Sequence, residues 1–409
     1  MIPLVYVCQP EKNLVMHFDL SFILNELAEN REDYFNAVAP PIVQTSNFRA
    51  RSVDELAGLF EDEYSGYLYS RGLNPTVDIL RKKLAALDGA EDALVFNSGA
   101  AAIFAAVLAN VQSGDHIISV RNPYTWAQRT FDVILPRFGV STTYVDGREM
   151  ALIREALRPN TRLLYLESPS SWSFELQDLR AAAQWAKEND IVTICDNSYA
   201  TPLYQRPIEM GIDLVLQSAT KYIGGHSDTV AGVLSGSRTL IKKIFDSEYL
   251  NIGSGIQPFN AWLLIRGLRT LPARLERCSR TTREVIAFLN AHPRVERVLF
   301  PLDSHFPQAQ LAGAQMEGAC GLFSFYLHAS SRREIVCFCE SLQHIFMAVS
   351  WGGHESLVLP RCASVPEAGF DPSHPEHRML RMYVGQEDAA YLIGDIAQAL
   401  DKMEAVQPG

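Results

Sequence analysis

Residues 214–232, LVLQSATKYIGGHSDTVAG, join a buried-strand pattern to side chains that suit chemistry. An apolar run at the start of this stretch is followed by Ser218, Thr220 and Lys221. A lysine that only packs at the end of an apolar strand costs free energy. Two hydroxyls beside it suit a phosphate, and desolvation lowers the pKa of a lysine, so that its free amine becomes a nucleophile. The stretch therefore predicts a nucleophilic lysine beside a phosphate site.

Two other predicted strands end in residues that fit the same interpretation. Residues 97–103, NSGAAAI, open a helix, so the amides of Gly99 and Ala100 lie at a helix N-terminus that suits phosphate. A small-residue turn needed for close packing would give the same pattern. The strand IVTICDNS ends at Asp196, which is either a turn or capping residue or a carboxylate that pairs with a cation. Ligands of open α/β sheets bind at such strand ends.

Together the three strand ends predict pyridoxal phosphate as the cofactor. The helix start and the hydroxyls suit its phosphate, Asp196 its pyridine nitrogen and Lys221 its aldehyde. A carboxylate that keeps the ring nitrogen protonated lets the ring act as an electron sink. A dinucleotide site is disfavoured, because residues 97–103 do not read G-x-G-x-x-G and no acidic residue follows at the distance that holds a ribose.

These residues must be positioned by an α/β sheet. From about residue 75, apolar strands alternate with helices of about ten or more residues, which favours a mostly parallel sheet wrapped by helices on both faces. Residues 1–60 are predicted to form an N-terminal arm and 61–258 the large cofactor-binding domain. After residue 258 strands and helices no longer alternate regularly, so residues 259–409 are predicted to form a linking helix and a smaller α+β domain.

The linking helix carries two residues that disfavour helix. Gly267 and Pro272 predict interruptions near these two positions.

The composition fits a globular enzyme rather than a nucleic-acid or membrane protein. Of 409 residues, 47% are hydrophobic and 20% charged, and the net charge of −11 argues against nucleic-acid partners. Seven cysteines without a C-x-x-C pair predict reduced thiols in the cytoplasm. The N-terminus lacks a basic region and a cleavage site, so no signal peptide is expected, and no apolar run reaches the ~18 residues of a membrane span.

Three further polar residues invite a metal or pocket interpretation. His226 and Asp228 in GGHSD are interpreted as hydrogen-bonding residues that shape the lysine loop, and no metal site is predicted. His354 in GGHES either faces the site or has a structural role.

The chain resembles the cysteine/methionine-metabolism family of pyridoxal-phosphate enzymes over nearly its whole length. The motifs that carry the resemblance are YSRGLNPT (69–76), SGAAAI (98–103), ESPS (167–170), DNSYATP (196–202), SATKYIGGHSD (218–228), RGLRTL (266–271), SWGGHESL (350–357) and LRMYVGQED (380–388). The resemblance implies the fold-type I architecture, with a mostly parallel seven-stranded sheet in the large domain and a smaller C-terminal α+β domain.

The resemblance also implies roles for the residues around the cofactor. Lys221 would be the Schiff-base lysine, Asp196 the partner of the pyridine nitrogen, and Tyr124 the ring that stacks on the cofactor and assists proton transfer. The phosphate would be bound by the side chains or amides of four residues, Gly99, Ala100, Ser218 and Thr220.

Other matching positions imply a substrate site and a shared assembly. Tyr69 and Arg71 match a pair that reaches the phosphate of a neighbouring subunit, which implies a catalytic dimer, usually paired into a homotetramer. Tyr69 would also face the substrate, as would Ser350 and Trp351. Arg381 would clamp the α-carboxylate of an amino-acid substrate through its planar fork, the alternative being a structural salt bridge.

Departures from the family pattern bear on the substrate. YTWA (124–127) stands where many members have Tyr-Gly-Gly-Thr, and Ser171-Trp172 replace Asn-Pro, which removes a contact with the ring hydroxyl. Val349 and Trp351 replace the acid and the leucine of Glu-Ser-Leu-Gly-Gly in members with γ-chemistry. The tryptophan version resembles bacterial cystathionine β-lyases, and an apolar residue here suits a shorter or less polar side chain.

These features predict a lyase that expels a thiol from Cβ of an L-amino acid. Lys221 would take the α-proton, and the products would be pyruvate and ammonia. The alternative of γ-elimination or γ-replacement, on a small or specialised amino acid, stays open at this point. An aminotransferase fits less well because the resemblance is to lyases, and a catalytically silent member of the fold is the remaining alternative.

Overall fold

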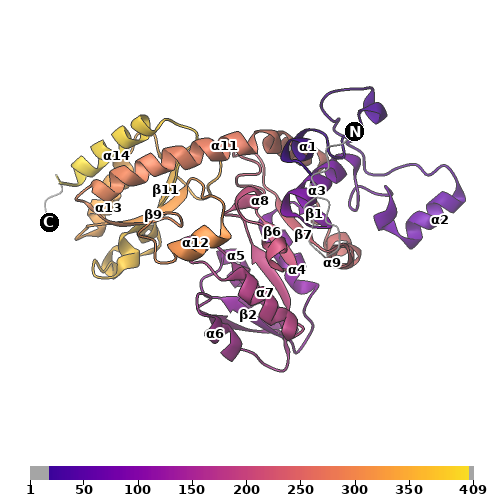
Figure 1. Cartoon of the computed structure of the whole chain (residues 1–409), viewed down its shortest axis with the longest axis horizontal. Coiled ribbons are helices and arrows are strands. Elements are labelled where there is room, and N and C mark those ends of the chain that lie inside the picture. Colours follow the sequence, from indigo (N-terminus) through magenta and orange to yellow (C-terminus); the bar gives the residue numbers. More distant parts are fainter. Residues whose placement is uncertain (1–17, 405–409) are drawn as a thin grey trace.

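The computed structural model describes residues 18–404, and two β-sheets joined by one long helix dominate it (Figure 1). The strands of the larger sheet are β1 Asp92–Phe96, β2 His116–Val120, β3 Ser141–Val145, β4 Thr161–Glu167, β5 Val192–Asp196, β6 Leu214–Gln217 and β7 Gly232–Gly236. Their order is β1-β7-β6-β5-β4-β2-β3. Strands β2 to β6 pair in parallel, and β7 runs antiparallel to both of its neighbours. The predicted mostly parallel, seven-stranded sheet is confirmed.

Helices cover both faces of this sheet, which explains its continuous apolar strands. Ile117 of β2 packs with residues of α4, Gly99–Leu108, whereas its neighbour Ile118 packs with residues of α7, Leu179–Glu188. Successive strand residues point to opposite faces, so the two residues enter separate core clusters. The other helices of this part are α1 Leu20–Asn25, α2 Val53–Glu61, α3 Pro75–Asp88, α5 Thr125–Arg129, α6 Met150–Glu155, α8 Thr201–Tyr204, α9 Arg238–Ile244 and α10 Leu250–Ile252.

The second sheet has five strands in the order β10-β11-β12-β9-β8. Its strands are β8 Val295–Leu299, β9 Leu322–Leu327, β10 Phe346–Met347, β11 Leu357–Pro360 and β12 Met379–Tyr383. The helices of this part are α11 Pro258–Ala291, α12 Ala309–Gln315, α13 Arg332–Ser341 and α14 Ala389–Glu404. This mixed sheet with helices against it confirms the predicted smaller α+β part.

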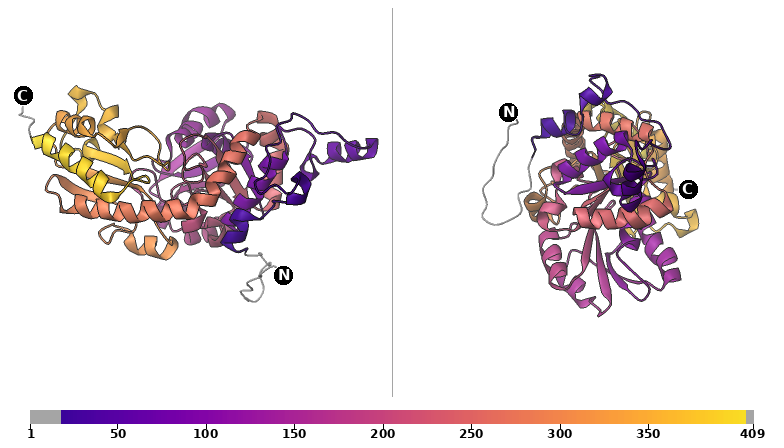
Figure 2. Two further views of the ribbon diagram at one scale, coloured as in Figure 1. Left: turned by 90° about the horizontal axis from the view of Figure 1, so that it is seen from above. Right: turned by 90° about the vertical axis from the view of Figure 1, so that its right-hand side faces the viewer.

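Helix α11 passes beside both sheets without a break (Figures 1 and 2). The prediction of interruptions near Gly267 and at Pro272 is therefore wrong. Pro272 removes one backbone hydrogen bond, but residues on both sides of it, such as Leu271 and Leu275, are buried in the core, and packing supplies most helical stability. Gly267 permits close contact, because a Cβ there would lie 2.4 Å from the Ile223 carbonyl oxygen.

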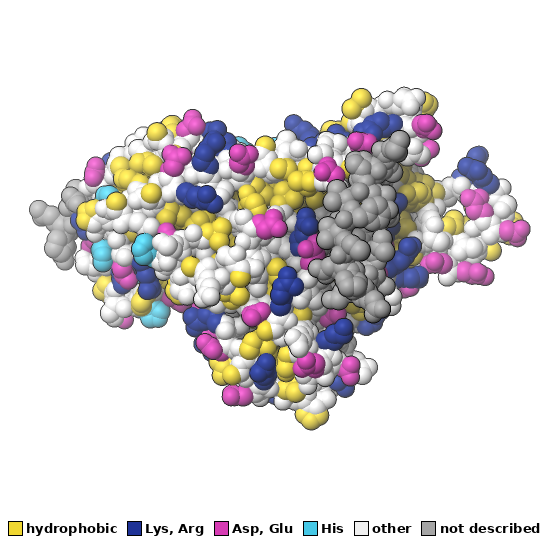
Figure 3. Space-filling model, in the orientation of Figure 1, with side chains coloured by type: hydrophobic (Ala, Val, Ile, Leu, Met, Phe, Trp, Pro, Cys, Tyr) yellow, Lys and Arg dark blue, Asp and Glu magenta, His cyan; other side chains and the backbone are white. Residues whose placement is uncertain are grey.

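The segment that carries α2 extends away from the rest of the chain in both views (Figures 1 and 2). Phe35, Val53 and Phe60 on this segment are largely exposed. The stretch on which the signal-peptide prediction rests lies outside the described residues. Within residues 18–404, no helix is both long and apolar enough to cross a membrane. On the face drawn in Figure 3, acidic and basic side chains are interspersed rather than gathered by sign.

Candidate active site

A cavity of about 730 Å³ lies where the carboxyl ends of the large sheet meet residues of the second sheet. Ten of the twelve residues predicted to contact the cofactor or the substrate line it: Gly99, Ala100, Tyr124, Asp196, Ser218, Thr220, Lys221, Ser350, Trp351 and Arg381. They come from segments far apart in the chain, and the fold brings them to one place.

Lys221 follows β6 and is held by the loop that contains Ser350 and Trp351. Its Nζ donates a hydrogen bond to Ser350 Oγ at 2.5 Å and lies 5.3 Å from the Trp351 ring centre. Burial, with a smaller effect of the nearby Arg381 cation, lowers the pKa of Lys221 to about 8, and Asp196 opposes this. About a tenth of such lysines carry a free amine at pH 7, compared with well under one in a thousand at an ordinary pKa.

The Ser350 loop has a strained backbone that aims its hydroxyl at the lysine. Ser350 has a φ of +83°, a region that residues with side chains rarely adopt. Gly352 has a φ of +89°, and a Cβ there would lie 2.7 Å from the backbone carbon of Lys221. Strain of this kind persists where the surroundings enforce it, and it gathers at functional sites.

Two carboxyl groups lie side by side at the strand ends. Asp196 ends β5 and is paired in register with Glu167, which ends β4. Burial, with the Asp196 charge second, raises the pKa of Glu167 to about 8, and burial also raises the pKa of Asp196. Ser198 N donates to Asp196 Oδ1 at 2.9 Å. Glu167 was missed at the sequence level, although it ends a strand just as Asp196 does, and that signal was sufficient to find it.

Glu167 also ties two site segments together. Its Oε2 accepts a hydrogen bond from Tyr124 N at 2.6 Å, and its Oε1 accepts one from Ser171 N at 3.0 Å. The Tyr124 side chain is 40% exposed, and partial burial and the charges of Asp196 and Glu167 raise the pKa of its phenol. The tyrosine hydroxyl is therefore a proton donor at neutral pH.

The start of α4 forms a small cradle. Ser98 Oγ accepts from Ala101 N at 3.1 Å, while the amides of Gly99 and Ala100 precede the first intrahelical hydrogen bonds. A Cβ on Gly99 would lie 3.2 Å from Ser218 Cβ, so glycine keeps room at this point. The Thr220 hydroxyl donates to the Ala231 carbonyl at 3.1 Å and accepts from Ala231 N at 3.0 Å, so the backbone of Ala231 holds it in place.

Tyr69 and Arg71 do not line this cavity within the chain. Tyr69 is 46% exposed, and the Arg71 guanidinium carbon lies 5.8 Å from the centre of the Tyr69 ring. The fold of one chain thus leaves this pair on the surface, outside the site.

Arg381 of β12 contacts Ser171 and Trp172, which follow β4. The buried guanidinium donates to the Ser171 carbonyl at 3.2 Å and lies 4.8 Å from the Trp172 ring centre. Burial lowers the pKa of Arg381 to about 10, with Glu167 opposing and the cation of Arg361 adding to the effect. The sequence singled out Trp172 only as a departure from the family pattern, and it gave no signal for Arg361.

The histidines near these motifs have other contacts. His226 Nδ1 lies 2.8 Å from the Gly224 carbonyl oxygen, and His354 is largely exposed, with Nδ1 3.1 Å from Glu355 Oε2. His354 does not line the cavity. In the part of the chain that the structure describes, no cluster of three His, Cys, Asp or Glu side chains is arranged to hold a metal ion.

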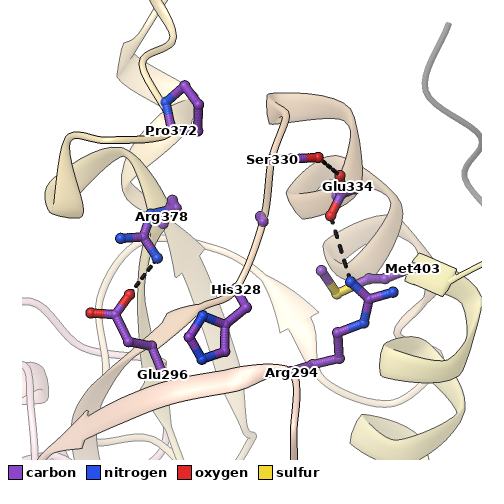
Figure 4. Close-up of a pocket in the computed structure, with 9 residues that line it drawn as sticks. Arg294, Glu296, His328, Ser330, Glu334, Pro372, Arg378 and Met403 are labelled. Atoms are coloured by element: carbon purple, nitrogen blue, oxygen red, sulfur yellow. Dashed lines mark hydrogen bonds and ion pairs between the residues drawn. The ribbon is translucent and has the colours of Figure 1, made fainter.

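A second hollow of about 550 Å³ lies in the C-terminal part and is lined by residues between Arg294 and Met403 (Figure 4). Arg378 pairs with Glu296, and Arg294 lies 3.8 Å from Glu334. Residues singled out from the sequence do not line it. Its opposite charges compensate one another, so it offers no excess charge to a ligand.

Comparison with known proteins points in one direction. The sequence profile of the family described as Cys/Met metabolism PLP-dependent enzyme matches residues 23–401. The L-methionine gamma-lyase of Treponema denticola is 36% identical over 377 residues, 90% of this chain and 94% of that protein. The cystathionine beta-lyase MetC of Bacillus subtilis is 34% identical over 375 residues, 90% and 93% of the two chains. The solved structure of metY from Campylobacter jejuni, with a pyridoxyl-lysine monophosphate, has a TM-score of 0.87 at 26% identity and covers 94% of this chain and 100% of its own.

Proposed function

The chain belongs to the Cys/Met metabolism family of pyridoxal-phosphate-dependent enzymes, and we propose that it is a carbon–sulfur lyase that eliminates a thiol from the β-carbon of an L-amino acid. One observation supports this most directly. The Lys221 amine, with its pKa lowered to about 8, opens into one cavity with the Asp196 carboxyl and the Arg381 guanidinium. Two relatives reported above are themselves lyases by name.

The residues that line the cavity fit the cofactor. The Gly99 cradle, where a Cβ would crowd Ser218, suits the phosphate, and Asp196 suits the pyridine nitrogen. When bound, pyridoxal phosphate supplies an aldehyde that links to amines and a ring that withdraws electrons from Cα. A protonated ring nitrogen beside Asp196 would also offset the cost of burying the Asp196 carboxylate.

The remaining residues would handle the substrate. Arg381 would orient the α-carboxylate, and Lys221 would take the proton from Cα and return a proton to the departing sulfur. Ser350 would hold the lysine amine in line, since its Oγ lies 2.5 Å from Nζ. Trp351, which is 7% exposed, would keep water from this side of the amine.

Elimination at the γ-carbon is the second candidate, because the relative at 36% identity is a methionine gamma-lyase. Two local features favour the β-carbon. Trp351 adds apolar bulk beside the lysine, and Val349 at the cavity mouth brings no carboxylate to a distant ammonium.

Product analysis distinguishes these reactions. The protein is incubated with cystathionine, cysteine, methionine and homocysteine, and the keto acid is identified. Pyruvate supports the proposal, whereas 2-oxobutyrate contradicts it in favour of γ-elimination. Lys221→Ala is the control and should lose turnover; a fully active variant would refute the role of the lysine. An absorbance near the visible edge that borohydride bleaches distinguishes an enzyme from a silent scaffold.

We also propose that the enzyme works in the cytoplasm as a homotetramer of catalytic dimers, in which Tyr69 and Arg71 serve the neighbouring subunit. The exposure of Tyr69 and Arg71 and their position outside the cavity of their own chain support a role in the neighbouring subunit. Co-expression of Lys221→Ala with Arg71→Ala tests it. If Arg71 serves the partner, mixed dimers regain one intact site and activity returns; if it acts within its own chain, no activity returns.

A further inference from the structure

Arg361 places a second guanidinium beside the one that would bind the α-carboxylate. It begins the turn that follows β11 and lines the cavity. Its guanidinium carbon lies 4.8 Å from the Trp172 ring centre, the same distance as that of Arg381. The two cations are therefore separated by no more than twice this distance, with one indole ring as their shared neighbour.

The other charged residues that line the cavity already have a task under the proposed function. Asp196 and Lys221 would face the cofactor, and Arg381 the α-carboxylate. Glu167 accepts hydrogen bonds from two backbone amides. Burial raises the pKa of its carboxyl group to about 8, so this group is mostly uncharged at neutral pH. Among the charged residues described around this cavity, Arg361 is left over.

The ion pair of Arg361 does not account for its place in the cavity. Its carboxylate partner is Glu376, at 3.5 Å, and the two side chains are 39% and 52% exposed. Pairs as exposed as this contribute little to stability. Meanwhile the Arg361 charge works against Arg381, whose pKa it helps to lower. The repulsion between the two guanidinium cations costs free energy, which an anion bound by both would offset.

We propose that Arg361 binds a second anionic group of the substrate, so that the substrate is an L-amino acid thioether whose side chain ends in a carboxylate beyond the sulfur. This inference rests on the proposed function and names its substrate class. Arg381 takes the α-carboxylate, and Arg361 takes the distal one through its fork of N–H donors. Val349 agrees with this, since the cavity mouth carries an apolar residue there instead of an acid that would repel the anion.

A pair of substrates of equal size tests the proposal in the holoenzyme. S-(carboxymethyl)-L-cysteine ends in a carboxylate, and S-(carbamoylmethyl)-L-cysteine ends in the neutral amide of the same shape. The wild type should show the lower KM for the carboxylate. Arg361→Met should raise that KM about five- to tenfold, as expected for losing one partly exposed charge-assisted contact, and should change the KM of the amide less than twofold. If Arg361→Met changed the KM of both substrates by the same factor, the proposal would be overturned.

Glu376→Gln is the matched control. It removes the ion-pair partner of Arg361 but leaves the guanidinium in the cavity, so the preference for the carboxylate should persist. If Glu376→Gln reproduces the effect of Arg361→Met, Arg361 acts only through its ion pair and the proposal is wrong. Arg361→Gln serves as the second variant should the methionine variant fail to bind cofactor.

A binding measurement separates this inference from the proposed reaction. The dissociation constants of glutarate and of its monoamide, glutaramate, are measured by calorimetry. Wild type should bind the dicarboxylate more tightly, and Arg361→Met should remove the difference. If neither cysteine derivative yields a keto acid while this preference is present, the proposed reaction fails and the second anion site stands. If keto acid forms but the preference is absent, the reaction stands and this inference fails.

Discussion

Replacing Asp88 with asparagine should make the protein more stable in a strictly pH-dependent way. Asp88 is the last residue of α3 and is fully buried, where it accepts hydrogen bonds from Gln217 Nε2 at 2.7 Å and Ser235 Oγ at 2.6 Å. Burial raises its pKa from 3.8 to about 7, against the effect of these two hydrogen bonds. The carboxyl thus joins α3 to β6 and β7 at the cost of a buried charge above neutral pH.

The magnitude follows from proton linkage. Between pH 4 and pH 7 the folded state holds a proton on Asp88 that the unfolded state has lost, so stability falls as pH rises through this window. A pKa difference of about three, at about 1.4 kcal/mol for each, gives a cost of about 4 kcal/mol once the group is ionised in both states. Asparagine keeps an acceptor for Gln217 and offers its amide protons to Ser235, and it cannot ionise.

Urea unfolding at fixed protein concentration and at several pH values from 4 to 8 measures this. The free energy of unfolding of Asp88→Asn, minus that of the wild type, should be near zero at pH 4 and rise to a few kcal/mol at pH 8. A difference for Asp88→Asn that is constant over the whole range would refute the reasoning.

Three further expectations concern the core, the cofactor and the lysine. Lys83→Met should lower the free energy of unfolding in urea by about 1–3 kcal/mol, because it removes the buried ammonium that donates to the Ile23 and Leu24 carbonyls and pairs with Glu29; adding Glu29→Gln should not recover the loss, because Glu29 also pairs with Arg31 and Arg269. Gly99→Ala should raise the dissociation constant of pyridoxal phosphate, measured by absorbance titration, because its Cβ would crowd the cradle at 3.2 Å; an unchanged constant would place the phosphate elsewhere. The apoprotein should take up pyridoxal phosphate faster with rising pH and level off above about 8, where the Lys221 amine is deprotonated, and Ser350→Ala should slow this uptake; a rate still rising at pH 10 would contradict the lowered pKa.

Much of the fold and part of the site follow from local sequence patterns. Alternating apolar strands and helices predict a parallel sheet, and the ends of such strands meet at one edge. Asp196 and Lys221 were therefore predictable as neighbours, and the cavity contains both. Glu167 obeys the same rule and was overlooked. The continuity of α11 through Pro272 was not predictable, because buried neighbours, not helix propensity, maintain it.

The second-sheet side of the site depends on long-range packing. Trp172 follows β4, whereas Arg361 and Arg381 lie on the far side of α11 in the sequence, and only the meeting of the two sheets brings these side chains together. No periodicity or spacing encodes such a contact. Arg71 and Tyr69 show the opposite limit, because the role proposed for them in a neighbouring subunit would leave no trace in the contacts of a single chain.

The unbroken helix α11 has a consequence for how the protein opens. Its buried aliphatic residues belong to one hydrophobic cluster that also contains Val95 and Val233 of the large sheet and Phe323 and Phe325 of the second sheet. The two sheets thus share one of the core clusters, and α11, about 50 Å long at 1.5 Å per residue, runs along it; the large sheet has two further clusters of its own. Local opening of either half would have to break contacts of the other, so amide hydrogen exchange in β7 and β9 should report a single cooperative unit. The predicted boundary at residue 258 would then cut through a hydrophobic cluster to which both segments contribute.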